Sequence, residues 1–253
     1  MADILSGKLN GQVALITGAS SGIGAAIAQA FLREGADLVA VARRGERLRA
    51  LQEAAHALNR RCLAVEGDVR EDETARRAVR AAIDDLGRLD LLVNNAGMAY
   101  YKSLAETSPE EYDTMMDTNM RGTFLFTRHV VPVFLAQRSG SIINIASMAG
   151  VMGFAGEAVY CATKFAQVGF TQALDRELRP HNIKVGAICP GGVKTEFALG
   201  TGRTEAGVAA SGMLDPEDVA GAALLMATQS AGSRIMEIRL RPMVEPLAGR
   251  DPE

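Results

Sequence analysis

The sequence contains few residues that could form disulfides or hold a metal ion. Its 253 residues include only three cysteines and three histidines. The cysteines, Cys62, Cys161 and Cys189, are odd in number and widely spaced, and none stands at a metal-ligand spacing from a histidine. These features predict reduced thiols, no metal site and a cytoplasmic location.

The chain also lacks a strong charge of either sign and long apolar runs. Its 27 lysines and arginines oppose 30 acidic residues, for a net charge of −3, whereas a nucleic-acid-binding surface needs a basic face. No apolar stretch approaches the length of a membrane span, and the first residues lack the pattern of a signal peptide. We therefore expect neither nucleic-acid nor membrane partners.

Short apolar segments alternate with helical patterns along the chain. The segments that predict strands are Val13–Ile16, Leu38–Ala42, Cys62–Glu66, Leu89–Val93, Ile142–Ala146, Lys184–Ile188 and Ile235–Leu240. Most are continuously apolar, as is typical of parallel strands that are covered on both faces. Apolar residues at three- and four-residue spacing between them predict helices. The alternation predicts an α/β fold with a doubly wound, mostly parallel sheet and helices on both faces.

No linker or low-complexity tract divides the chain, so we expect residues 1–253 to form a single dinucleotide-binding catalytic domain. Residues 195–214 interrupt the alternation with a glycine-rich segment before Asp215. This segment predicts a lid over the site, although a plain surface connection is equally compatible with its composition. Residues 242–253 are rich in proline and charge and predict a loosely held tail.

A glycine-rich turn, Thr17 to Gly24, directly follows the first predicted strand and opens a helical pattern. Gly18 allows a tight turn, and Gly22 and Gly24 let the backbone approach a pyrophosphate at a helix N-terminus, where free N–H groups favour anions. The segment predicts dinucleotide binding. The alternative is a tight strand-to-helix connection without a ligand.

Tyr160 and Lys164 are four residues apart, so they share one face of a predicted helix. A cation beside a phenol favours the phenolate, and we expect the pKa of Tyr160 to fall from about 10 toward neutral. Such a tyrosine can exchange a proton with an alcohol or a ketone. Ser147 follows the strand predicted at 142–146, at the edge where open α/β sheets bind ligands. Taken alone, a Tyr-x-x-x-Lys pair is more often a solvated surface pair.

The motifs occur in the order and spacing of a known family. Thr17 to Gly24, Asn94 to Gly97, Asn119, Ser147, Tyr160 with Lys164, and Pro190-Gly191 together resemble the short-chain dehydrogenase/reductase family, over about residues 8 to 241. The resemblance implies a Rossmann-type sheet of seven strands. It also implies hydride transfer between a nicotinamide cofactor and a carbonyl or alcohol.

The resemblance also implies roles for four catalytic residues. Tyr160 resembles the general acid and base, and Ser147 the hydroxyl that hydrogen-bonds the substrate oxygen. Lys164 resembles the residue that lowers the tyrosine pKa and binds the nicotinamide ribose. Asn119 resembles the asparagine that holds a water connecting the lysine to solvent.

Further residues match the cofactor-binding positions of the family. Asp68 resembles the acid that accepts from the adenine amino group, and Asn94 to Gly97 resemble the segment that steadies the sheet and lines the adenosine ribose. Pro190, Val193 and Thr195 resemble the elements placed against the nicotinamide carboxamide. The full predicted set is Gly18, Ser20, Ser21, Gly22, Ile23, Gly24, Arg43, Arg44, Asp68, Val69, Asn95, Ala96, Gly97, Tyr160, Lys164, Pro190, Val193 and Thr195.

The end of the second predicted strand bears on the choice of cofactor. NAD-preferring folds usually carry an acid there, but Ala42 is followed by Arg43 and Arg44. A guanidinium can bind a 2′-phosphate bidentately, so we expect NADP(H). The alternative is that both arginines are solvated charges at the start of a helix. Ser20 and Ser21 stand where some NADP-binding members carry a basic residue, so strict selectivity is not expected.

Apolar residues flank the predicted site and favour an apolar pocket. They are Met98, Tyr100, Tyr101, Met148, Met152, Phe154, Phe197 and Met213. Because the sequence pattern places no arginine or lysine there, we expect a neutral carbonyl or alcohol as the small-molecule substrate.

The leading prediction is an NADP-dependent carbonyl reductase or secondary alcohol dehydrogenase. A 3-oxoacyl-carrier-type reductase is an alternative, although the last predicted strand departs from the C-terminal turn of such relatives. A non-catalytic nucleotide-sensing regulator is another. The family resemblance implies a homo-oligomer, a tetramer or dimer, through helices near residues 121–138 and 157–180. Their apolar residues are Phe124, Phe126, Val130, Phe165, Phe170 and Leu174.

Overall fold

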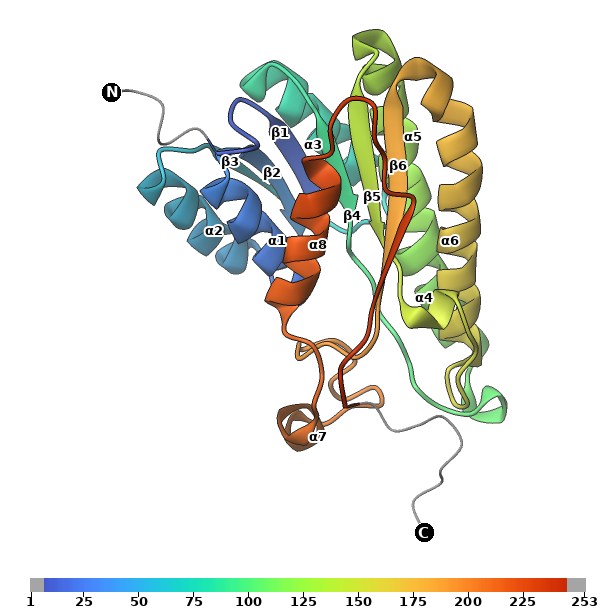
Figure 1. The fold of residues 1–253 in the computed structure, drawn as a ribbon. Coiled ribbons are helices and arrows are strands. Elements are labelled where there is room, and N and C mark those ends of the chain that lie inside the picture. The colour runs from blue at the N-terminus through green and yellow to red at the C-terminus, as the bar shows by residue number, and fades with distance from the viewer. Residues whose placement is uncertain (1–6, 245–253) are drawn as a thin grey trace.

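The computed structural model describes residues 7–244, which fold around one seven-stranded sheet (Figure 1). The strand order is β3-β2-β1-β4-β5-β6-β7, and each pairing within residues 7–244 is parallel. The strands are β1 Val13–Thr17, β2 Asp37–Ala42, β3 Cys62–Glu66, β4 Leu91–Asn94, β5 Gly140–Ile145, β6 Ile183–Pro190 and β7 Glu237–Leu240. The predicted α/β, Rossmann-type, doubly wound fold is confirmed.

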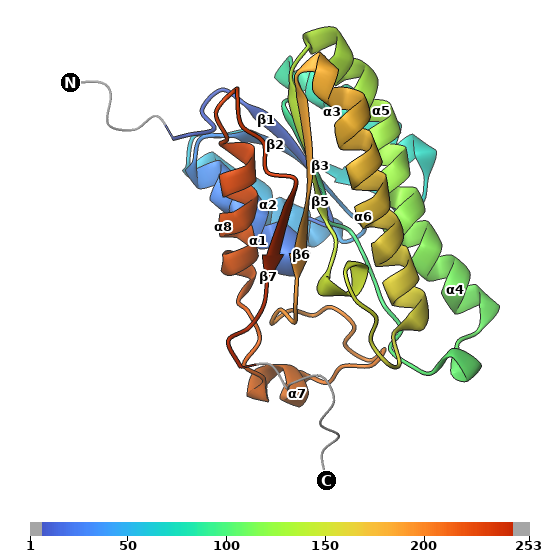
Figure 2. The same ribbon diagram turned by 45° about the vertical axis from the view of Figure 1, so that its right-hand side comes forward.

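Helices cover both faces of the sheet (Figures 1 and 2). One face carries α1 Gly22–Arg33, α2 Gly45–Ala57 and α8 Pro216–Ala227. The other carries α3 Asp72–Leu86, α5 Gly122–Gln137 and α6 Ala158–Leu178, with α4 Pro109–Met116 beside α6. The short helix α7 Glu205–Ala210 lies beyond the carboxyl end of the sheet. Within residues 7–244 no helix is both long and apolar enough to cross a membrane.

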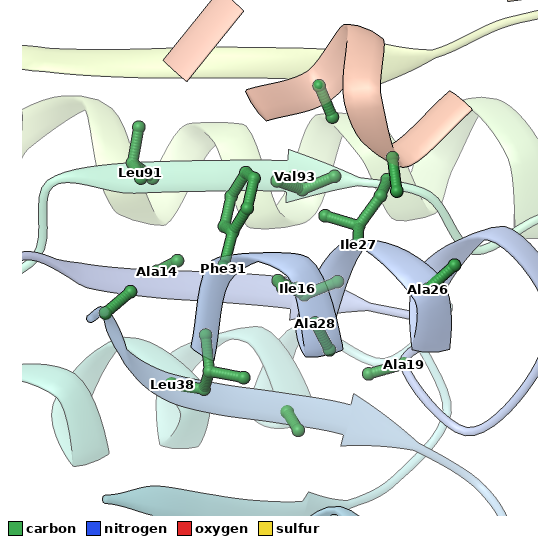
Figure 3. Packing of buried hydrophobic residues seen from close by; sticks show 14 of the residues in the cluster. Ala14, Ile16, Ala19, Ala26, Ile27, Ala28, Phe31, Leu38, Leu91 and Val93 are labelled. Atoms are coloured by element: carbon green, nitrogen blue, oxygen red, sulfur yellow. The ribbon is translucent and has the colours of Figure 1, made fainter. Parts of the chain in front are cut away.

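The two faces form separate hydrophobic cores. Phe31 and Ile27 of α1 pack over Ile16 and Val93 in the first core, while Leu15, the neighbour of Ile16, belongs to the second (Figure 3). Alternate residues of each strand therefore enter different cores, which explains why the strands read as continuous apolar runs. Each fully buried large side chain contributes about 1.5–3 kcal/mol of hydrophobic free energy.

The chain order of the strands produces a switch point beside β1. The connection from β1 leads to β2 on one side, whereas β4 adds to the other side of β1. Loops at this edge diverge, and ligands of open α/β sheets bind in the resulting crevice. Residues 195–214 follow β6 at the same edge. The tail predicted at 242–253 lies mostly outside the described residues.

The structure corrects part of the predicted subunit interface. Phe126, Val130 and Leu174 are buried in the second core, because they lie on the helix faces that pack against the sheet. They cannot also contact another subunit. Phe124 and Phe165 lie on the opposite faces and are 44% and 47% exposed. Phe170 is partly buried against the second core. The prediction of a homo-oligomer therefore rests mainly on Phe124 and Phe165.

Candidate active site

A cavity of about 960 Å³ opens at the carboxyl edge of the sheet. Nearly all predicted site residues line it, from elements distant in the chain. These are Gly18, Ser20, Ser21, Gly22, Ile23, Arg43, Arg44, Asp68, Val69, Asn95, Ala96, Gly97, Ser147, Tyr160, Lys164, Pro190, Val193 and Thr195. Gly24 and Asn119 lie behind this lining, and Asn119 is fully buried.

The glycine-rich turn between β1 and α1 forms a narrow cradle. Gly18 has a positive φ of 66°, and a Cβ atom there would lie 2.8 Å from Asn95 Nδ2. A Cβ on Gly24 would lie 2.3 Å from the Gly18 carbonyl oxygen. The Ser21 side chain does not cap α1, so the N–H groups of the first turn remain available to an anion in the cavity.

Arginines gather at the adenosine end of the cavity. Arg44 Nη2 donates to Ser21 Oγ at 2.7 Å and more weakly to Ser20 Oγ at 3.4 Å. Its Nη1 donates to Glu196 Oε2 at 2.9 Å, and Arg47 binds the same carboxylate. The Glu196 carboxylate thus accepts from an Arg44 donor that could also bind a phosphate group. Arg43 lies exposed at the cavity wall.

Asp68, the predicted adenine contact, already has a protein partner. Its Oδ2 accepts from Arg70 Nη2 at 2.7 Å. This hydrogen bond lowers the pKa of Asp68 below its ordinary value. The carboxylate therefore stays ionised at neutral pH and keeps acceptor capacity toward the cavity.

The predicted catalytic residues meet at the other end of the cavity. Ser147 follows β5, and its Oγ accepts from the Ala149 backbone N–H at 3.1 Å. Tyr160 and Lys164 project from α6 and are only 6% and 3% exposed. Lys164 Nζ lies 5.8 Å from the centroid of the Tyr160 ring.

The pKa values at this end differ from the expectation. Burial raises the pKa of Tyr160 above its ordinary value, and the hydrogen bond with Ser147 only partly offsets this effect. Burial also lowers the pKa of Lys164 to about 7. The prediction that Lys164 brings the tyrosine pKa toward neutral is wrong for the protein without a ligand, because desolvation disfavours both charged forms.

Gln167 links Lys164 to Asn119. Lys164 Nζ donates to Gln167 Oε1 at 2.8 Å and to the Ile145 carbonyl at 3.1 Å. Gln167 Nε2 in turn donates to the Asn119 carbonyl at 2.9 Å and to Thr123 Oγ1 at 2.7 Å. Gln167 therefore connects Lys164 directly to the backbone of the helical turn that carries Asn119.

Aromatic side chains surround the Tyr160 ring. The Tyr101 ring lies edge-on to it at 5.7 Å between centroids, and the Phe197 ring lies 5.8 Å away. Met98, Tyr100, Met148 and Phe154 also line the cavity, as predicted. Met152 and Met213 do not: Met152 packs against a neighbouring apolar cluster, and Met213 lies beside Gly192.

Two charged residues line this aromatic end as well. They are Glu157, just before α6, and Arg203, from the segment 195–214. The statement that no arginine or lysine faces the pocket is therefore wrong for Arg203. The argument for a neutral substrate loses its basis with it.

Comparison with known proteins assigns this arrangement to a family. The family model of short chain dehydrogenases matches residues 12–206. The chain belongs to the short-chain dehydrogenase family. It is 36% identical over 236 residues to an uncharacterized oxidoreductase of Staphylococcus epidermidis, a match that covers 93% of this chain and 99% of that relative.

Two solved short-chain enzymes are similar over almost their whole length. A serine dehydrogenase, solved in its closed form with NADP+, is 32% identical with a TM-score of 0.88, covering 96% of this chain and 99% of that one. A metagenomic short-chain oxidoreductase solved with NADP is 33% identical with a TM-score of 0.81, covering 94% and 100%. The chain is accordingly an oxidoreductase of the short-chain type.

Sequence reasoning missed several residues of this short-chain dehydrogenase site. Gln167 stands three residues after Lys164 on the same helix face, so its spacing could have predicted the contact. Glu196 and Arg203 carry no such signal, because the arginine partners of Glu196 and the Tyr101 partner of Arg203 lie far away in the chain. Glu196, for example, is 152 residues from Arg44.

Proposed function

We propose that this chain is an NADP-dependent oxidoreductase that interconverts an alcohol and the corresponding ketone or aldehyde. One observation carries the proposal: a single cavity joins the glycine cradle and arginines at one end to Ser147, Tyr160 and Lys164 at the other. The positions fit a dinucleotide that lies along the edge of the sheet with its reactive end beside Tyr160.

The residues present fit NADP(H). The glycine cradle and the first turn of α1 would hold the pyrophosphate, and Lys164 the nicotinamide ribose. Arg43, Arg44 and the serines of the turn would hold the 2′-phosphate, since Arg44 already donates to the Glu196 carboxylate and to Ser21 Oγ. Two similar solved enzymes contain NADP, which supports the same choice. The bound cofactor supplies or accepts a hydride.

Tyr160 would transfer the proton. In the direction of reduction, Tyr160 would give its phenolic proton to the substrate carbonyl oxygen, and Ser147 would donate a hydrogen bond to that oxygen. The raised pKa of Tyr160 keeps the phenol protonated in the protein without a ligand, so the proton is present, although burial also makes the phenol a weaker acid. In oxidation the flow reverses, and Tyr160 must first lose its proton. A positive charge beside the ring, on Lys164 or on a ligand, would assist that loss.

The test is a panel of ketones, aldehydes and alcohols assayed for a change in reduced-nicotinamide absorbance with NADPH and NADH, and with their oxidised forms. We expect turnover with NADP(H) that Tyr160→Phe abolishes. NADPH binding measured by fluorescence serves as the control for folding. Tight cofactor binding without turnover across the panel would instead favour a nucleotide-sensing role.

We also propose that residues 195–214 act as a lid, because residues from both 195–199 and 201–203 line the cavity. Two hydrogen bonds already tie this segment to the loop after β4. Tyr101 N donates to the Thr201 carbonyl, and Thr201 Oγ1 donates to the Ala99 carbonyl, both at 2.8 Å. Opening the lid would break these bonds.

A further inference from the structure

Arg203 is a cation at the substrate end of the cavity. Its guanidinium carbon lies 5.6 Å from the centroid of the Tyr101 ring and 5.8 Å from that of Phe197. It donates weakly to the Val193 carbonyl at 3.4 Å and lies within hydrogen-bonding reach of the Tyr101 hydroxyl. Among the residues that the structure describes, none forms an ion pair with it. Most of its five donors are therefore available to a ligand.

The backbone holds Arg203 in place through a tight turn. Arg203 N donates to the Ala198 carbonyl at 2.9 Å, and Gly200 N donates to the Arg203 carbonyl at 3.1 Å. Ala198 has a φ of 60°, a conformation that L-residues rarely adopt. Gly202 has a φ of 134°, and a Cβ atom there would lie 2.3 Å from Tyr101 Cβ. Such backbone conformations cluster at functional sites.

The charges around Arg203 leave it open to an anion. Glu157 lines the same end of the cavity and is near enough to interact electrostatically with Arg203, but no ion pair joins the two side chains. Burial raises the pKa of Glu157, which weakens its ability to neutralise the guanidinium. Arg203 is also close enough to act electrostatically on Tyr160. A ligand that reaches Tyr160 therefore passes within the field of this cation.

We propose that the substrate is a small hydroxy acid or oxo acid, whose carboxylate pairs with Arg203 while its hydroxyl or carbonyl group meets Ser147 and Tyr160. A planar guanidinium matches a carboxylate bidentately, and the aromatic rings of Tyr101 and Phe197 exclude water from the pair. The inference rests on the proposed function and deepens it by naming the substrate class.

The test compares hydroxy acids that carry a secondary hydroxyl on carbon two, three or four with their methyl esters, in the oxidation direction with NADP+. Wild type should favour at least one acid over its ester in kcat/KM. Arg203→Met, which keeps contact with both rings, should reduce kcat/KM for that acid roughly 10- to 100-fold, mainly through KM. Rates with the ester should change little. The kcat/KM of Arg203→Lys for the acid should lie between those of wild type and Arg203→Met, because lysine keeps the positive charge but cannot bind a carboxylate bidentately.

Lys194→Met is the matched control, because Lys194 immediately precedes residues 195–214 but pairs with Asp215 outside the cavity. It should leave the preference for acids unchanged. Equal use of acids and esters by wild type, or a preference for amino alcohols, would overturn the proposal.

Binding separates this inference from the proposed function. Calorimetry of each hydroxy acid against the protein loaded with NADP+ needs no turnover. Binding that wild type shows and Arg203→Met lacks would support the carboxylate site even if no compound is oxidised. If wild type neither binds nor turns over any of the acids, the carboxylate site is refuted, whatever the outcome with neutral alcohols.

Discussion

Lys164→Met should change how stability depends on pH. An unfolded lysine titrates near 10.4, whereas burial lowers the pKa of folded Lys164 to about 7. Between these values the unfolded chain binds one more proton than the folded chain, so the free energy of unfolding rises with pH. This contribution amounts to about 2 kcal/mol between pH 7 and pH 9. Methionine has no titrating group, so the Lys164→Met variant lacks this pH-dependent contribution to stability.

The measurement is the melting temperature without cofactor, from pH 6 to pH 9.5 at constant ionic strength. For a chain of this size, about 2 kcal/mol corresponds to roughly 4–8 °C. Between pH 7 and pH 9, the melting temperature of wild type should therefore rise by that amount relative to the melting temperature of Lys164→Met. The acceptors of Gln167 and Ile145 that the variant leaves unpaired add a cost that does not depend on pH.

Lys194→Met is again the control, since its side chain is 40% exposed and its ion pair lies at the surface. The melting temperature of Lys194→Met should change with pH in the same way as that of wild type over this range. A pH-independent difference between wild type and Lys164→Met would mean that Lys164 keeps an ordinary pKa in the folded protein. The reasoning from burial would then fail.

Three further predictions concern catalysis, cofactor choice and assembly. Tyr160→Phe should lower turnover roughly 100- to 10,000-fold with NADPH affinity nearly unchanged, and near-normal turnover would contradict the acid role. Arg43→Ala and Arg44→Ala should each weaken NADPH about 10- to 100-fold and leave NADH almost unaffected, as the ratio of kcat/KM values would show. If wild type prefers NADH, neither Arg43 nor Arg44 has the proposed role in binding the 2′-phosphate. Light scattering at micromolar concentration should give an oligomer that Phe124→Glu or Phe165→Glu weakens, and a wild-type monomer would exclude this assembly.

Much of the fold follows from the sequence because its signals are local. The continuous apolar runs predict all seven strands to within two residues of their observed ends. Burial on both faces makes the runs of inner strands such as β1 and β4 apolar throughout, so their pattern can be recognised without knowledge of the neighbouring strands. The glycine turn and the Tyr160–Lys164 spacing are equally local. Together they predict that both ends of the site lie at the carboxyl edge of one sheet, and in the structure one cavity joins the two ends.

The chemistry inside the cavity depended on tertiary structure. The spacing of Tyr160 and Lys164 predicts that they are neighbours, but burial decides the direction of their pKa shifts, and burial depends on the whole fold. Gln167 meets the carbonyl of Asn119 only because α6 packs beside the helical turn that carries Asn119. Arg203 reaches the substrate end because hydrogen bonds join its turn to a loop about a hundred residues earlier. Such contacts leave no periodic trace in the sequence, since the two partners are set by packing and not by spacing.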